Sequence, residues 1–261
     1  MNFVNDKPTS PLYRVIRWLV WLFSPKFRLY GTEQLPKEPC VIVGNHCHMY
    51  GPIVGELYTP GKHYVWCIGE MMQKSEVAAY AYQDFWSAKP KWSRWFYRLL
   101  SHVITPLSVL IFTNAHTVPV YHDARLTRTY RESMERLEEG NHIVIFPERA
   151  VRHNNIVYDF QDNFIALARF YYKKTGIALK FVPCYVAPKR KSVYYGAPLT
   201  YRPEARFEEE KLRLCHGLMD AVTQMAVELP EHTVVPYPNV SARHYPKNIP
   251  LEDYTHEETA G

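Results

Sequence analysis

The sequence lacks an apolar run of the roughly 18 to 20 residues that a membrane-spanning helix needs. Its longest candidate, residues 12–23, is interrupted by Arg14 and Arg17. This segment is not typical of a secretory signal either, because Asp6 precedes it and no small-x-small cleavage site follows before Pro25. We therefore expect neither a spanning segment nor a cleaved leader.

Cysteine is scarce, and its spacing excludes the usual structural roles. The five cysteines form an odd set without the close spacing of a zinc knuckle: Cys40, Cys47, Cys67, Cys184 and Cys215. This predicts reduced thiols in a cytosolic environment. His46 and His48 together with Cys47 or Cys67 would need a second ligand pair at short spacing to bind a metal, and the sequence has none. We expect no metal site.

The excess of positive over negative charge is small, whereas aromatic residues are plentiful. Lys and Arg number 31 against 26 Asp and Glu, a formal net charge of +5, which is too small to predict a nucleic-acid partner. The chain carries 20 Tyr, 12 Phe and 6 Trp. Aromatic and basic residues together suit a membrane–water interface.

Residues 12–23 are typical of an amphipathic helix. Their apolar positions follow helical spacing: Leu12, Val15, Ile16, Leu19, Val20 and Phe23. Arg14 and Arg17 lie elsewhere on the helical wheel. The pattern predicts a helix lying in a bilayer interface, and the alternative is a core-packing helix with a basic edge.

The rest of the chain alternates short apolar runs with longer amphipathic ones, which is typical of an α/β fold. We expect strands at 26–30, 40–43, 64–68, 117–121, 143–146, 180–186 and 192–195. We expect helices at 91–104, 124–139, 160–174 and 206–229, the first of them a second basic and aromatic amphipath. The chain has no internal repeat and no break in composition, so the sequence predicts a single α/β domain with a mixed sheet flanked by helices.

Three segments follow from this division. Residues 1–25 form the N-terminal membrane-surface helix, and residues 26–229 form the α/β domain. Residues 230–261 are rich in proline and polar residues and end acidic, which predicts an extended arm over the surface and a frayed tail.

Two short apolar strands are each followed by a polar group. Asn45 and His46 follow residues 41–43, and Glu148 follows residues 143–146. In open α/β sheets, ligands bind beyond the carboxyl ends of the strands. We expect these residues to lie in the same crevice.

Five short blocks in order resemble the glycerolipid acyltransferases of the lysophosphatidate acyltransferase family. They are Gly31-x-Glu-x-Leu-Pro36, Cys40-Val-Ile-Val-Gly-Asn-His46, Val118-Pro-Val120, Phe146-Pro-Glu148 and Phe181-Val-Pro183. In that family the block at residues 40–46 corresponds to Asn-His-x4-Asp, and the block at residues 146–148 corresponds to Phe-Pro-Glu-Gly. A late Val-Pro pair in the family follows a strand. The resemblance covers residues 31–201.

The resemblance implies a transfer of a fatty acyl group from a thioester to an alcohol. His46 matches the family's general base, a role that suits an imidazole because it titrates near neutral pH. Glu148 matches the carboxylate of the family's Phe-Pro-Glu block and is expected to help hold the polar head of the acceptor. Asn45 is expected to contact substrate. The alternative role of Glu148 is a helix cap or salt-bridge partner.

Two departures from the family pattern stand out. The position of the orienting Asp, five residues after His46, is occupied by Gly51. Either Glu56, Glu70, Asp84, His48 or a backbone carbonyl orients the ring instead, or the chain transfers poorly or not at all. The family's phosphate-binding arginines are displaced as well, and Arg125, Arg149 and Arg152 are the nearest replacements, with solvated surface charge as their alternative role.

The sequence therefore predicts an acyltransferase of phospholipid biosynthesis that works peripherally at the cytoplasmic face of a membrane. The donor is acyl-CoA or acyl carrier protein, used as a co-substrate without another cofactor, and the acceptor is a lysophospholipid or a glycerol-phosphate-like alcohol. The expected partners are membrane lipids and the acyl donor. The alternative is a catalytically degenerate lipid-binding pseudoenzyme on the same fold. A hydrolase is less favoured, because the chain has no Gly-x-Ser-x-Gly motif.

Overall fold

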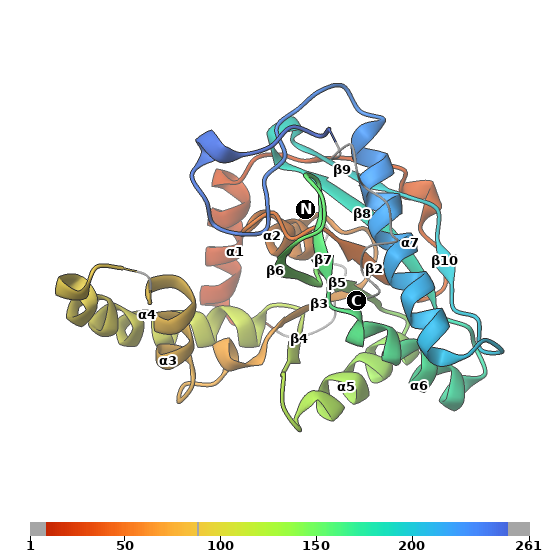
Figure 1. Cartoon of the computed structure of the whole chain (residues 1–261). Coiled ribbons are helices and arrows are strands. Elements are labelled where there is room, and N and C mark those ends of the chain that lie inside the picture. Colours follow the sequence, from red (N-terminus) through yellow and green to blue (C-terminus); the bar gives the residue numbers. More distant parts are fainter. Residues whose placement is uncertain (1–8, 88, 250–261) are drawn as a thin grey trace. The chain divides into compact units, whose positions relative to one another are not determined.

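The computed structural model describes residues 9–87 and 89–249, and their contacts group into two compact units (Figure 1). The first unit comprises Met1–Ser24 and Tyr64–Glu132, and the second comprises Pro25–His63 and Ser133–Gly261. The second unit contains both His46 and Glu148, so it is the unit in which the candidate chemistry lies.

The second unit is built on a mixed sheet. Its strands follow the order β1 (Arg28–Tyr30), β9 (Ser192–Tyr195), β8 (Lys180–Ala187), β2 (Val41–Gly44) and β5 (His142–Ile145). Strand β2 runs parallel to both β8 and β5, whereas β8 and β9 are antiparallel. Strand β10 (Leu199–Thr200) pairs with the first residues of β8. The predicted α/β class with a mixed sheet flanked by helices is confirmed.

The core of the second unit lies around β8 and β2. Every residue of β2 is buried, and so is every residue of β8 after Lys180. Helix α7 (Phe207–Val227) packs along β8 (Figure 1) and buries Leu214, Leu218 and Val222 at the three- to four-residue spacing of one helix face. Each fully buried leucine contributes about 1.5–3 kcal/mol to stability. This packing fixes the positions of the strand ends that carry the candidate site.

Further elements complete the second unit. They are helix α2 (Tyr50–Tyr58), the hairpin of β6 (Glu148–Arg152) and β7 (Tyr158–Phe160), and helix α6 (Ala166–Thr175). Short 3-10 turns occupy Thr32–Gln34, Asp162–Ile165, Pro188–Arg190 and Ala242–His244. Helix α6 ends at Gly176, whose φ of 72° is the left-handed conformation that glycine adopts at helix ends.

The first unit contains helix α1 (Pro11–Phe23), strand β3 (His63–Ile68, of which His63 belongs to the second unit), helix α3 (Val77–Ala81), helix α4 (Arg94–Asn114) and strand β4 (Thr117–Val120). Strands β3 and β4 are parallel. Short turns cover Gly69–Met72, Tyr82–Trp86 and Lys91–Ser93. Helix α5 (Leu126–Glu138) passes from the first unit into the second.

Helix α1 begins where the sequence favours it. The Ser10 hydroxyl accepts a hydrogen bond from the Tyr13 N–H, and Pro11 occupies the first turn. The Ser10 N–H donates to the Asn114 side chain at the end of α4, at 2.8 Å. The start of α1 is thereby tied to the end of α4.

Two predicted helices have wrong bounds. The segment predicted as helix 160–174 begins instead in β7, because Phe160 pairs with Glu148 in the hairpin, and α6 starts only at Ala166. The helix predicted to end at residue 104 continues through Pro106 to Asn114. Proline removes one backbone donor and disfavours a helix interior, which is why the sequence indicates an earlier end.

Candidate active site

The candidate site begins in the turn after β2, where Asn45 anchors the chain. The Asn45 side chain accepts a hydrogen bond from the Val186 N–H at 2.7 Å and donates to the Val186 carbonyl at 3.1 Å and to Cys47 Sγ at 2.8 Å. Its side chain is 1% exposed. Both amide hydrogens are therefore used inside the fold, and Asn45 ties the turn to β8.

The next residues turn the chain back sharply. Cys47 and His48 have φ values of 47° and 53°, a left-handed conformation that costs a residue other than glycine on the order of 1 kcal/mol. The Gly51 N–H then donates to the His46 carbonyl at 2.9 Å. This local strain is maintained because the surrounding contacts over-determine the turn.

Gly51 has no room for a side chain. A Cβ atom at this position would lie 2.5 Å from the His46 carbonyl oxygen and 3.0 Å from the His46 carbonyl carbon and Cα. These are backbone atoms of the turn itself, which cannot move aside as a flexible side chain can. The glycine is thus required by the close approach of residue 51 to residue 46.

Glu148 joins the two strand ends. Its Oε2 accepts from the His46 backbone N–H at 2.7 Å, and its Oε1 accepts from the Tyr158 N–H at 2.6 Å. The side chain is 4% exposed, and burial raises the pKa of Glu148 to about 7 against the opposing effect of the two N–H donors. Among the described residues, the carboxyl group therefore makes neither a helix cap nor a salt bridge, and it holds the backbone of the His46 turn.

The His46 imidazole lies between two aromatic rings. Its centroid is 5.3 Å from that of Tyr237 at an interplanar angle of 87°, and 6.1 Å from that of Phe146 at 75°. Both are edge-to-face arrangements. The ring of Phe146 in turn lies 3.0 Å from the place that a Cβ at Gly55 would occupy, so the glycine in α2 makes room for it.

Nδ1 of His46 is buried and makes no hydrogen bond with any described residue. Burial is the main cause that lowers the pKa of His46, and the backbones of His48 and His46 itself oppose the shift without reaching hydrogen-bond geometry at Nδ1. The imidazole is therefore neutral at neutral pH, which is the form that accepts a proton. Nε2 is the nitrogen left to do so.

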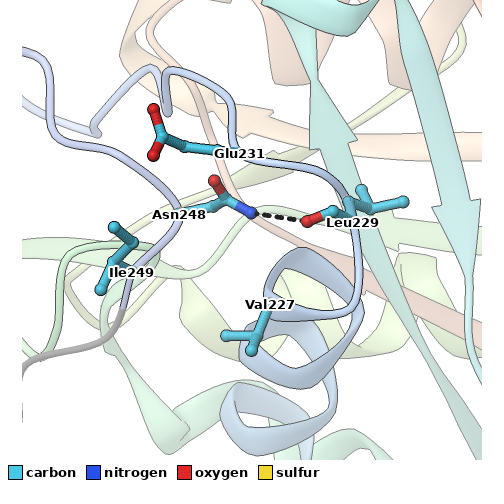
Figure 2. A pocket seen from close by; sticks show the side chains of 5 residues that line it. All are labelled: Val227, Leu229, Glu231, Asn248 and Ile249. Carbon is cyan, nitrogen blue, oxygen red and sulfur yellow. Dashed lines mark hydrogen bonds between the residues drawn. The ribbon is translucent and has the colours of Figure 1, made fainter.

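A closed loop from the C-terminal part of the chain lies against this turn. We call residues 232–248 the strap, because His232 and Asn248 exchange hydrogen bonds at its two ends and the Val234 N–H donates to the Pro246 carbonyl. The Asn248 side chain donates to the Ala226 carbonyl and also to the Leu229 carbonyl, the second of which Figure 2 shows. The strap is thus anchored to the end of α7.

The strap contacts both histidines of the turn. Tyr237 packs on His46, and Nε2 of His48 donates to the Pro238 carbonyl at 2.7 Å. Tyr245 lies edge-on to His48, with its hydroxyl 3.4 Å from Nδ1. His48 is therefore engaged by the strap through both ring nitrogens.

Two of the three arginines predicted to bind phosphate lie on β6 beside Glu148. Arg149 is half-exposed and its Nε donates to Asp159 Oδ2 at 2.6 Å, while Arg152 is exposed and donates to the Asn155 side chain. The predicted site residues of the second unit thus lie in the turn after β2 and on β6, which the hydrogen bond between His46 and Glu148 connects.

Arg125 lies in the first unit. There it pairs with Asp123 at 2.8 Å, with Glu76 at 3.0 Å and with Glu70 at 3.7 Å, and its guanidinium lies 4.1 Å from the centre of the Tyr121 ring. The pKa of Arg125 is raised, mainly by the Asp123 hydrogen bond. Its charge is balanced by three neighbouring carboxylates.

The structure shows no contact between the His46 ring and the described carboxylates that the sequence offers as its orienters. Glu70 lies in the first unit with Arg125. Glu56 lies in α2 and has interactions of its own, and the side chain of Asp84 lies outside the described part of the structure. Among the described residues, no carboxylate bonds the His46 ring.

The described residues hold no group of three or more His, Cys, Asp or Glu side chains that could bind a metal ion. A cavity of about 230 Å³ lies at the end of α7 and is lined by Val227, Leu229, Glu231, Asn248 and Ile249 (Figure 2). Glu231 is paired with Lys247 at 3.0 Å. The cavity has no residue in common with the His46 turn.

Sequence reasoning missed Val186, Tyr158 and Tyr237. Val186 and Tyr237 meet the site through residues distant in the chain, and Tyr158 meets it across the β6–β7 hairpin. Tyr237 lies in a proline-rich stretch with no periodic pattern. The only available signal was the position of Val186 at the end of a predicted buried strand.

Comparisons with known proteins identify no family for the chain. No protein-family model matches it, and no curated protein matches its sequence. Among solved structures, it is similar to the 1-acyl-sn-glycerophosphate acyltransferase PlsC of Thermotoga maritima, with 19% identity, 84% of this chain and 81% of that chain covered, and a TM-score of 0.45.

Proposed function

We propose that this protein is an acyltransferase with His46 as general base. It would move a fatty acyl group from acyl-CoA or acyl carrier protein to the hydroxyl of a lysophospholipid or a glycerol-phosphate-like acceptor. The observation that carries the proposal is the 2.7 Å hydrogen bond between Glu148 and the His46 backbone, which joins the polar ends of two paired parallel strands. Strand ends of this kind are where α/β proteins bind ligands.

The chemistry needs few groups. The acceptor hydroxyl attacks the thioester carbonyl, a new C–O bond forms, and the C–S bond breaks. His46 accepts the hydroxyl proton and can return it to the departing thiolate. Because a thioester is already activated and a thiolate leaves readily, no covalent intermediate on the protein is required.

The neighbouring residues have supporting roles in this proposal. Asn45 and Glu148 hold the turn that presents His46, since their polar atoms are already bound to the backbones of Val186, His46 and Tyr158. Arg149 and Arg152 are exposed on the same hairpin as Glu148 and would contact an acceptor phosphate. Arg125 is assigned the same role with less support, because three carboxylates pair with it, whereas Arg149 pairs with Asp159 and Arg152 bonds the neutral Asn155 amide.

The first unit supplies surfaces suited to a membrane. On α1, large apolar side chains are exposed, among them Leu12, Val15, Leu19, Val20 and Phe23. On and before α4, large apolar residues are exposed as well: Trp92, Trp95, Phe96, Leu99, Val103 and Leu107. Lys91, Arg94 and Arg98 accompany them, as at an interface with anionic lipid.

Among the described helices, the one formed by Lys91–Asn114 is long and apolar enough to cross a membrane by length and composition. The sequence indicated no such segment, because the pattern ended at residue 104, short of Pro106. We propose peripheral association through α1 and α4 at the cytoplasmic face of a membrane, with the span of α4 as the alternative.

One observation favours a second candidate function, a lipid-binding pseudoenzyme. A base that uses Nε2 must carry its own proton on Nδ1, and the buried Nδ1 has no acceptor among the described residues. In serine proteases, replacing the carboxylate that serves this purpose lowers turnover about ten-thousandfold. A chain with an intact fold and an unsupported base would bind lipid without transferring acyl groups.

A labelled acyl-CoA donor separates the two functions. The purified protein is incubated with vesicles that contain lysophosphatidate or lysophosphatidylcholine, and with glycerol 3-phosphate in solution, and the lipids are extracted. Time-dependent labelling of one acceptor supports the acyltransferase. Vesicle binding without labelling, with both acyl-CoA and acyl carrier protein as donors, supports the pseudoenzyme.

A further inference from the structure

The His46 ring lies against the strap, whose Tyr237 packs on it. A hydrogen bond to Nδ1 would fix the ring, and none of the described residues supplies one. Position 51 cannot supply it, because even a Cβ there would lie 2.5 Å from the His46 carbonyl oxygen. The ring must therefore be held by contacts other than a carboxylate.

Besides the backbones of His48 and of His46 itself, two aromatic rings contact the imidazole, and they come from two sides. Phe146 follows β5 directly, so its position is set by the sheet. Tyr237 makes the closer contact, at 5.3 Å and 87°, and it also packs against Tyr158 at 6.2 Å. Edge-to-face pairs have a preferred geometry and an energy on the scale of a neutral hydrogen bond. They can thus restrict the rotation of a buried ring.

Tyr237 can act in this way only if it is itself fixed, and the strap fixes it. The strap is closed by hydrogen bonds between residues 232–234 and 246–248, and His232 is bound to the Tyr185 hydroxyl on β8 at 2.8 Å. The residue after Tyr237 accepts the 2.7 Å bond from His48. Both ends of the strap and its middle are therefore tied to the unit that carries His46.

We propose that Tyr237 is a positioning residue that holds the His46 imidazole in its working orientation in place of a carboxylate. The inference rests on the proposed function, in which His46 is the base. It names the specific residue that compensates for the side chain that Gly51 lacks.

The test combines a structural and a kinetic readout on the full chain. We compare wild type with Tyr237→Ala, Tyr237→Leu and Tyr237→Phe, and with Val240→Ala as the control, because Val240 is an exposed residue of the same strap. Histidine is labelled with ¹⁵N, and His46→Gln identifies the His46 signals by difference. The other ionisable groups beside the ring, Glu148 and His48, are unchanged in all five proteins.

The expected result is specific to ring position. In wild type, Tyr237→Phe and Val240→Ala, we expect His46 to titrate below its ordinary value of 6.5, as burial dictates. In Tyr237→Ala and Tyr237→Leu, the pKa of His46 moves up toward that value or the ring signals show two orientations. The turnover number then falls on the order of 10- to 100-fold with little change in KM, and Tyr237→Phe restores it.

Two results would overturn the proposal. One is unchanged His46 signals and turnover in a folded Tyr237→Ala or Tyr237→Leu protein. The other is an equal effect in Val240→Ala. Absence of acyl transfer in wild type would reject the proposed function instead, and the nuclear magnetic resonance comparison would still decide whether Tyr237 positions His46.

Discussion

Substitution of Gly51 tests the description of the turn most sharply. Gly51→Ala adds one methyl group whose carbon would lie 2.5 Å from the His46 carbonyl oxygen. The backbone of residues 46–51 must shift to relieve this contact, and overpacking of this kind lowers the free energy of unfolding by about 1–3 kcal/mol. The shift also weakens the 2.9 Å hydrogen bond from the Gly51 N–H, at a further cost of about 1 kcal/mol.

One effect acts in the opposite direction. Alanine favours a helix over glycine by about 1 kcal/mol, and Gly51 lies in the first turn of α2. We therefore expect the free energy of unfolding to fall by about 1–3 kcal/mol, which lowers Tm by roughly 2–12 °C in a chain of this size. Gly51→Asp should lose more, because it also buries a carboxylate.

The same close contact affects any attempt to restore the missing carboxylate at position 51. If a missing carboxylate were all that separated this chain from an efficient enzyme, Gly51→Asp would raise the rate. The structure predicts the reverse, a less stable protein with no gain in rate. Met49→Asp is the matched control, because Met49 is an exposed residue of the same turn that can carry the same charge without the close contact.

Thermal unfolding of wild type, Gly51→Ala, Gly51→Asp and Met49→Asp, followed by circular dichroism, gives the comparison. We expect Met49→Asp to melt close to wild type and both Gly51 variants to melt lower. A Gly51→Ala protein as stable as wild type, or a Gly51→Asp protein that is stable and faster, would refute the account of the turn.

Three further predictions follow from the same contacts. Between pH 4.5, the ordinary pKa of a glutamate, and about pH 7, the folded state retains the Glu148 proton, so the free energy of unfolding falls by about 3 kcal/mol as pH rises through that range. Denaturant titrations should show a flatter pH profile of this free energy in Glu148→Gln than in wild type. The same difference in free energy of unfolding between the two proteins at pH 4.5 and at pH 8 would contradict this. Replacing Leu19 and Trp95, which are exposed on α1 and α4, by serine should weaken co-sedimentation with anionic vesicles at unchanged Tm, whereas Ile177→Ser, an exposed apolar position after α6, should not; equal binding by all three would argue against membrane contact. Arg152→Ala should raise KM for a phosphate-bearing acceptor more than it lowers kcat, and an effect on kcat alone would remove the phosphate role.

The strands around the site could be predicted from the sequence because their apolar runs are continuous. The strands expected at 40–43, 143–146 and 180–186 are observed as β2, β5 and β8, each within a residue of the expected bounds. Their burial on both faces leaves no polar alternation to confuse the pattern. The placement of His46 and Glu148 at neighbouring strand ends followed from these strands.

Other elements left little trace in local sequence. Helix α2 contains Gly51, Pro52 and Gly55, which argue against a helix although the backbone there is helical. Strand β6 is exposed after Glu148 and carries two arginines, so it reads as a loop. In both cases, contacts with the rest of the fold decide the conformation.

The surroundings of His46 could not be predicted, because they depend on long-range contacts. His48 and Pro238 are 190 residues apart in the chain, and no periodic pattern marks the strap that joins them. Likewise, the sequence shows that residue 51 is glycine but not that its Cβ position is closed. From the sequence alone, Gly51 indicates the loss of an orienting carboxylate, whereas the structure shows that packing requires a glycine there.

Acyl transfer by wild type and by His46→Gln tests the central claim most directly. Glutamine keeps a side chain of similar reach but cannot accept the hydroxyl proton as a base, and the backbone N–H that binds Glu148 remains. With a labelled acyl thioester and the acceptor that wild type uses, we expect His46→Gln to keep its Tm and to lose turnover by at least about a hundredfold, the lower end of what a general base contributes. A folded His46→Gln protein with the turnover of wild type would contradict the account.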